Sequence, residues 1–208
     1  MNRYIAEFIG TFFLVLTIGC SVLATGKGII PPIAIGSALM IMVYAGGRVS
    51  GAHFNPAVTL AIWIRGRVKI ADVGPYIAAQ LAGAALAALA ATFLRPDAVV
   101  DVMTPNVPRA LVAEALFTFA LAYVVLNVAT TKDTAGNSYY GLAIGFTVLT
   151  GAFSVGDISG GAFNPAVAVG LSVMGLSAWS NIWIYVVACC AGAAAAAVVF
   201  KTMNPDDR

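Results

Sequence analysis

The sequence SGAHFNPAV at residues 50–58 recurs as SGGAFNPAV at residues 159–167, with seven of the nine positions identical. The same offset of 109 residues aligns residues 34–36 with residues 143–145, each reading Ala-Ile-Gly. Both copies contain Asn-Pro-Ala, in which Asn is a favoured helix N-cap and Pro is favoured at the first helical position. The chain is therefore predicted to be an internal duplication in which a helix starts at the same point of each half.

The composition excludes a soluble domain. Of the 208 residues, 61% are hydrophobic and only 10% are charged, and the mean hydropathy is +0.93. A soluble domain of this length has about a quarter of its residues charged. The net charge of +2 provides no basic field, so nucleic acid is not an expected partner. The three cysteines lie in apolar runs without metal-ligand spacing, and no metal site is expected.

Six apolar runs are long enough to cross a bilayer, which takes about 20 residues per helix. Two shorter apolar stretches, residues 55–64 and 164–173, cannot cross as helices and indicate re-entrant half-helices. We therefore predict an all-α membrane protein with six transmembrane helices and two re-entrant half-helices. The six long runs are residues 4–26, 29–47, 73–94, 110–130, 139–156 and 178–200.

The basic residues predict the orientation of these spans. With the N-terminus in the cytoplasm, eight basic residues lie inside and three outside, which is the bias that the positive-inside rule requires. Both termini are then cytoplasmic in a multi-pass protein of the cell (inner) membrane. The inside set is Arg3, Arg48, Arg65, Arg67, Lys69, Lys132, Lys201 and Arg208, and the outside set is Lys27, Arg95 and Arg109.

Each half holds three spans, an odd number, so the second half starts on the opposite side of the membrane. The chain is thus expected to form a single channel domain over residues 1–208, with inverted repeats over about 1–107 and 108–208. In such a repeat the functional site lies near the midplane, here at residues 55–57 and 164–166. Two converging helix N-termini make that point positive, which opposes cations and protons, and the asparagine amides can donate to a passing oxygen. The simpler interpretation, that Asn-Pro is only a helix cap, does not explain two matched copies. The pore residues are Asn55, Pro56, Ala57, Asn164, Pro165 and Ala166.

These motifs resemble those of the major intrinsic protein (aquaporin and aquaglyceroporin) family over essentially the whole chain. The resemblance rests on both Asn-Pro-Ala boxes, on Ala-Glu-x-x-x-Thr at residues 6–11 and 113–118, and on Tyr-x-x-x-Gln-x-x-Gly at residues 76–83. It implies a homotetramer with one pore per protomer, passive flux of water and small neutral solutes across the lipid bilayer, and no cofactor.

Four acidic or titratable positions need separate interpretation. In the family, the residues that match Glu7 and Glu114 hold the backbone of the re-entrant loops, and we expect the same structural role here, since a carboxylate inside a span must be satisfied. His53 either lines the cytoplasmic half of the pore, packs in the loop, or serves as a pH gate. Asp157 lies where the outer vestibule is expected, either attracting cationic species or as a solvated loop acid.

The chain departs from the family at the outer constriction, where most members place an aromatic ring and an arginine. The position of the arginine, directly after the second Asn-Pro-Ala box, is Val167. Counting from the boxes, the other three positions are Ile35, Ala152 and Gly161. This set is small and apolar, so we expect an opening wider than that of a strict water channel.

Three functions remain to be compared. The first is a channel for water and small neutral solutes, with ammonia, urea, glycerol, metalloid acids and peroxide as candidates. The second is a channel with some ion permeability, favoured by the missing arginine and opposed by an apolar constriction that dehydrates ions. The third, a driven transporter or intramembrane enzyme, lacks the buried ion-coordinating groups or the nucleophile–base pair that it needs.

Overall fold

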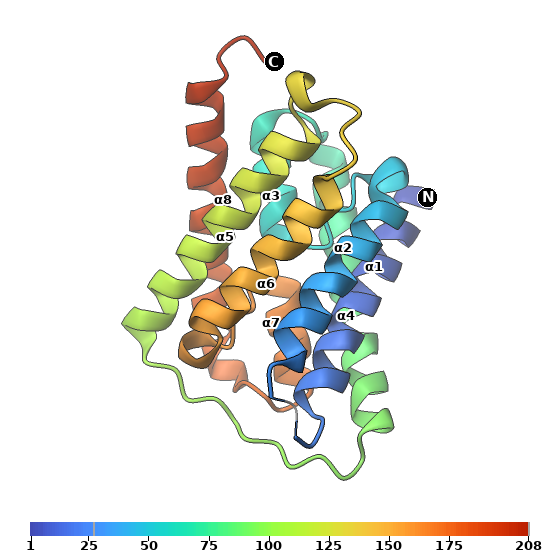
Figure 1. Cartoon of the computed structure of the whole chain (residues 1–208), viewed down its shortest axis with the longest axis vertical. Coiled ribbons are helices and arrows are strands. Elements are labelled where there is room, and N and C mark those ends of the chain that lie inside the picture. The colour runs from blue at the N-terminus through green and yellow to red at the C-terminus, as the bar shows by residue number, and fades with distance from the viewer. Residues whose placement is uncertain (27, 208) are drawn as a thin grey trace.

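The computed structural model describes residues 1–26 and 28–207, and these residues form a bundle of helices (Figure 1). Two short single turns, η1 (Lys132–Thr134) and η2 (Trp179–Asn181), lie in the connections. The remaining elements are eight α-helices, namely α1 (Asn2–Val22), α2 (Ile30–Ser50), α3 (Pro56–Arg65), α4 (Ile70–Leu94), α5 (Val107–Ala129), α6 (Tyr140–Ser159), α7 (Pro165–Val173) and α8 (Ile182–Met203).

Six of the helices in the described part of the chain, α1, α2, α4, α5, α6 and α8, are long and apolar enough to cross a membrane. The protein is therefore a multi-pass integral membrane protein. Helix α1 packs most extensively on α4, and α5 packs equally extensively on α8. Gly83 of α4 and Gly192 of α8 allow these close approaches, because a Cβ atom at either glycine would collide with the backbone of α1 or α5.

The short helices α3 and α7 have ten and nine residues. At a rise of about 1.5 Å per residue, such a helix is about 15 Å long and covers half of a hydrocarbon core of about 30 Å. Helix α3 packs against α8, and α7 packs against α4, so each short helix lies against a long helix of the other half of the sequence. The start of α1 and the end of α8 lie near the same end of the bundle (Figure 1).

The structure confirms the six spans and the short helices and moves several boundaries. The first apolar run was expected to reach residue 26, but α1 ends at Val22. Helix α2 continues to Ser50, beyond the expected end at residue 47, because Arg48 in its last turn complements the helix dipole. Gly51 then ends α2 in the left-handed conformation, with φ 88°. Lys27 and Arg208, which contribute to the expected charge bias, lie outside the described residues.

Candidate functional site: a pore through two facing half-helices

The loop that leads into α3 is held by a carboxylate of α1. Glu7 is fully buried. Its Oε1 accepts hydrogen bonds from Ser50 Oγ at 2.6 Å and from the backbone N–H of His53 at 2.9 Å. Its Oε2 accepts from the backbone N–H of Phe54 at 2.7 Å and from Gln80 Nε2 at 2.9 Å. One side chain thus satisfies two backbone donors that have no helix or sheet partner.

The loop that leads into α7 is held in the same way by Glu114 of α5, which is also fully buried. Its Oε1 accepts from Ser159 Oγ at 2.7 Å and from the backbone N–H of Ala162 at 3.0 Å. Its Oε2 accepts from the backbone N–H of Phe163 at 2.6 Å and from the Cys189 thiol at 3.6 Å. The structure therefore places both glutamates against the re-entrant loops.

These bonds fix a backbone conformation that the sequence alone disfavours. Phe54 and Phe163 both have φ 49°, in the left-handed region that a bulky residue rarely occupies. Each phenylalanine donates its backbone N–H to the buried glutamate of its own half. Strain of this kind persists only where the surroundings over-determine it, and it concentrates at functional sites.

The two asparagines link the half-helices across the midplane. Asn55 Nδ2 donates to the carbonyl oxygen of Phe163 at 2.8 Å, and Asn164 Nδ2 donates to that of Phe54 at 2.8 Å. Each asparagine Oδ1 caps its own helix, with bonds of 2.8 Å to the N–H of Ala57 and 2.9 Å to that of Ala166. Since a primary amide has two N–H donors, each asparagine keeps one N–H beyond its cross-link.

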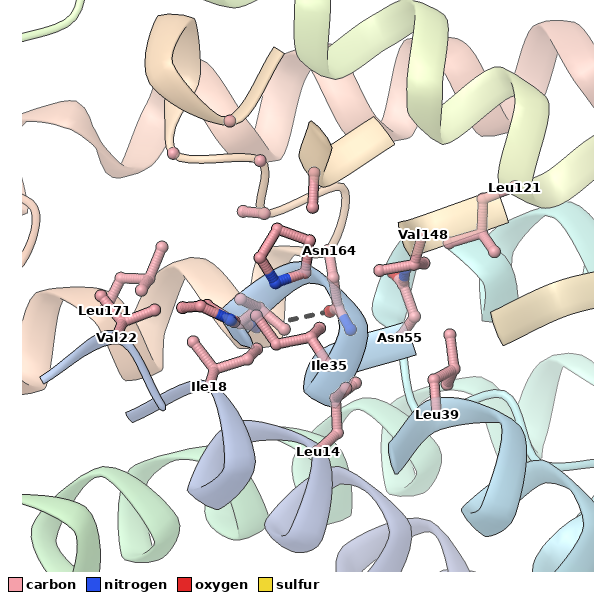
Figure 2. Close-up of a pocket in the computed structure, with 18 of the residues that line it drawn as sticks. Leu14, Ile18, Val22, Ile35, Leu39, Asn55, Leu121, Val148, Asn164 and Leu171 are labelled. Carbon is pink, nitrogen blue, oxygen red and sulfur yellow. Dashed lines mark hydrogen bonds between the residues drawn. The ribbon is translucent and has the colours of Figure 1, made fainter. Parts of the chain in front are cut away.

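A cavity of about 570 Å³ runs past both asparagines. Figure 2 shows Asn55 and Asn164 surrounded by apolar side chains from α1, α2, α5, α6 and α7. All four residues of the expected outer constriction line this cavity. They are Ile35, Ala152, Gly161 and Val167.

The linings of two cavities at opposite ends of the bundle carry opposite charges. Asp157 lines the 570 Å³ cavity together with Asp101, and we call this end the outer mouth. A second cavity of about 1190 Å³ opens at the other end, the inner mouth. Its charged lining residues are Arg3, Arg48, Arg67, Lys69, Lys132 and Asp72.

The chain's last described residues contact two residues that line the inner mouth, Arg67 and Lys132. Asp207 makes ion pairs with Arg65 at 2.9 Å and with Arg67 at 3.5 Å, and it accepts from the backbone N–H of Lys132 at 3.2 Å. Partial burial alone would raise the pKa of Asp207, but the Lys132 N–H and the two guanidinium groups outweigh it and hold this pKa below its usual value. The Arg65 side chain is 2% exposed and also lies over the Phe200 ring, 4.9 Å from its centroid.

Sequence reasoning assigned no contacts to several groups near the cavity. Tyr76 and Tyr185 donate their hydroxyls to the carbonyl oxygens of Ser50 and Ser159, at 2.8 and 2.7 Å, and so tie the ends of α2 and α6. Thr59, in an apolar stretch that gave no signal, bonds to His53. The repeat offset aligns both tyrosines and both serines, and this pairing was the signal that could have found them.

Comparison with known proteins identifies the family. The family model described as "Major intrinsic protein" matches residues 1–200. The chain belongs to the major intrinsic protein family. It is therefore a membrane channel of the aquaporin and glycerol-facilitator type and not an enzyme, and this family transports water and small neutral solutes. No group of three or more His, Cys, Asp or Glu within the described residues is arranged to hold a metal ion.

Relatives within the major intrinsic protein family match the chain over its full length. It is 37% identical over 220 residues to "Glycerol uptake facilitator protein-like 6" of Lactiplantibacillus plantarum, covering 100% of both chains. It is 36% identical to "Putative aquaporin NIP4-1" of Arabidopsis thaliana, covering 100% of this chain and 76% of the relative. The fold matches that of the aquaglyceroporin from Plasmodium falciparum, with a TM-score of 0.83 and 22% identity over 98% of this chain and 97% of the other.

Proposed function

We propose that this protein is a channel for passive, bidirectional flux of water and small uncharged solutes, and that it is not restricted to water. The observation that carries the proposal is the cavity that passes both Asn-Pro-Ala boxes and the set Ile35, Ala152, Gly161 and Val167. At the midplane, two helix N-termini and two asparagine N–H donors receive a solute oxygen. The same positive ends oppose cations and protons.

The outer constriction supports a solute range wider than water. An arginine at position 167 would narrow the opening, add a fixed cation and offer donors to a polyol. Valine offers none of these, and neither do the three small or aliphatic residues around it. Ammonia, urea, glycerol and small hydroxylated metalloid acids are the candidate solutes.

The test is stopped-flow light scattering on proteoliposomes with a panel of these solutes. Permeability to water and to at least one solute above empty liposomes supports the proposal, and flux no different from empty liposomes overturns it. Val167→Arg is expected to reduce solute permeability more than water permeability, because it narrows the opening and adds a charge. Equal loss of both fluxes would contradict the assignment of Val167 to the constriction.

A second candidate function is partial ion permeability. It is favoured by Asp101 and Asp157 at the outer mouth, since carboxylates raise the local concentration of cations. Against it stand the apolar lining and the positive midplane. Planar-bilayer recording in symmetric salt separates the two functions, because a silent bilayer combined with active swelling excludes conduction, and single-channel steps establish it.

The proposal includes assembly and placement. We propose one channel domain over residues 1–208 with inverted repeats, cytoplasmic termini, residence in the inner membrane, and a homotetramer. Exposed apolar residues along the long helices, such as Phe93, Leu89 and Leu116, are available to lipid or to neighbouring protomers. Mass measurement in detergent tests the tetramer, and accessibility of a cysteine introduced at residue 2 from each side of right-side-out vesicles tests the orientation.

A further inference from the structure

The repeat relates the outer constriction to a second ring of residues at the other end of the pore. Adding or subtracting the offset of 109 gives the partner of each outer residue. We call the partners the inner ring. The four pairs, outer residue first, are Ile35 and Ile144, Ala152 and Val43, Gly161 and Ala52, and Val167 and Val58.

The inner ring is bulkier than the outer constriction. Two of the four pairs are identical in residue type, and in the other two the inner residue is larger, with Val43 against Ala152 and Ala52 against Gly161. The next position along the chain differs more between the two halves. His53 follows Ala52, whereas its partner at the offset of 109 is Ala162. If the backbones of the two halves are similar, the inner end of the pore is the narrower one.

The solvent exposure of the side chains also indicates that the inner ring is more tightly packed than the outer constriction. All four inner residues are buried, with Val43 and Val58 at 2%, Ile144 at 4% and Ala52 at 7% exposed. In the outer set only Val167 is buried, and Ile35, Ala152 and Gly161 are all partly exposed.

The cavities divide at the inner ring. The 570 Å³ cavity starts at the outer mouth, passes the outer constriction without interruption, passes both asparagines and reaches His53. The 1190 Å³ cavity of the inner mouth reaches the same histidine from the other side. Among the described residues, His53 and Ile144 alone line both cavities. The two cavities therefore meet at these two side chains.

The hydrogen bonds around His53 determine which of its ring nitrogens accepts. Thr59 donates its one hydroxyl proton to the carbonyl oxygen of Asn55, at 3.0 Å. The Thr59 oxygen then accepts from Gln80 Nε2 at 3.0 Å and from His53 Nδ1 at 3.1 Å. Since a neutral imidazole has one N–H, His53 Nε2 is an acceptor. Nε2 points toward Gly51, a lining residue of the inner cavity, and no described protein group bonds to it.

We infer that selection in this pore takes place at the inner ring and not at the outer constriction, with Val43 and Ile144 setting the solute size and His53 Nε2 accepting a hydrogen bond from the passing solute. This inference rests on the proposed channel function and gives it a location. A permeant molecule meets an acceptor at His53 and donors at the two asparagines. Water, urea and polyols carry both donors and acceptors, so each can bond to His53 and to the asparagines on this path.

The size filter is tested by the same isoleucine-to-alanine change at an inner-ring residue and at its outer partner. Ile144→Ala and Ile35→Ala are compared in proteoliposomes with water, glycerol and the four-carbon polyol erythritol. The ratio of erythritol to water permeability is expected to rise about tenfold more in Ile144→Ala than in Ile35→Ala, equivalent to about 1.4 kcal/mol of barrier. An equal rise in both, or a larger one in Ile35→Ala, overturns the inference. Absence of any flux in the wild-type protein overturns the proposed function instead.

A second pair of variants covers the case in which Ile144→Ala does not fold. Val43→Ala gives the inner position the residue already present at its outer partner, and Ala152→Val makes the reverse change at the outer constriction. Val43→Ala is expected to raise the erythritol-to-water ratio, and Ala152→Val is expected to lower it by a smaller factor. The inference fails if Ala152→Val has the larger effect. Gel filtration and thermal unfolding in detergent establish that each variant is folded.

The acceptor is tested at His53 itself. His53→Leu keeps a side chain of similar bulk but has no acceptor, whereas His53→Gln keeps an amide oxygen. Water permeability is expected to fall about tenfold in His53→Leu, corresponding to about 1.4 kcal/mol, and to fall less in His53→Gln. Equal water permeability in the leucine and glutamine variants would overturn the acceptor role of His53. The size filter would then be judged by the Ile144 and Ile35 variants alone.

Discussion

The loops before α3 and α7 are alike in their framework and differ in what they present to the pore. Both are held by a buried glutamate, capped by an asparagine and closed by a serine whose carbonyl accepts a tyrosine hydroxyl. Around the first loop, three polar side chains form a connected network, and at the matching positions of the second loop the residues are small. The three pairs are His53 and Ala162, Thr59 and Ala168, and Gln80 and Cys189.

This difference separates folding from selection. The framework common to both halves satisfies the backbone of two loops that no helix or sheet supports, so it has to be present twice. The polar network is present once and extends to the pore through the His53 ring. In the arrangement that we propose, the inverted repeat keeps a symmetric scaffold, and one half alone carries the side chains that recognise a solute.

The largest expected effect tests the common framework. Glu7→Ala and Glu114→Ala each leave two buried backbone N–H groups without an acceptor. At about 1–3 kcal/mol for each unsatisfied group, either change should cost about 2–6 kcal/mol and remove most of the folded protein. Thermal unfolding and recovery after purification in detergent measure this loss.

The matched controls are Glu7→Gln and Glu114→Gln, which keep one carbonyl acceptor and should retain more folded protein than the alanine variants. If one alanine variant is as stable as the wild type while the other is lost, the two loops are not equivalent, and the symmetric framework would have to be abandoned.

The second largest effect is expected at Thr59, which tests the polar network that only the first loop has. Thr59→Val keeps the shape of the side chain but leaves His53 Nδ1 and one N–H of Gln80 without an acceptor. A loss of about 1–3 kcal/mol is expected in the free energy of unfolding, with a fall in water permeability because the ring of His53 is released. Thr59→Ser keeps the hydroxyl and should stay close to wild type. A stable, fully permeable valine variant would mean that the network does not orient His53.

The sequence predicted most of the framework and little of the network. The two Asn-Pro-Ala boxes and the short helices recur at an offset of 109 residues, and the glutamates recur at an offset of 107 residues. Such a repeated pattern is visible without a structure. Thr59 and the tail residue Asp207 have no such signal. Their partners are set by how α3 packs and by where the last residues of the chain lie, so only the folded structure brings them together.

A smaller effect is expected at the inner mouth and depends on pH. Because the pKa of Asp207 is lowered in the folded protein, its ion pairs contribute stability above the unfolded pKa of about 3.9, and this contribution is lost as the pH falls through the folded pKa. Asp207→Asn should therefore lower the unfolding temperature at pH 7 and show less of the wild type's decline toward pH 3. Parallel pH curves for both proteins would mean that the tail contact contributes nothing.

The smallest effect on stability is expected at Cys189, the residue that matches Gln80 in the second half of the repeat. Its thiol lies 3.6 Å from Glu114, is fully buried and is one of four donors to that carboxylate. In Cys189→Ser, a shorter hydroxyl bond to Glu114 offsets the cost of burying a more polar group, so the unfolding free energy should change by less than about 1 kcal/mol. Water permeability should be unchanged, since no group at this position extends to the pore. A serine variant that loses permeability would place a selecting group in the second half as well, and the division between a shared scaffold and a one-sided filter would then be wrong.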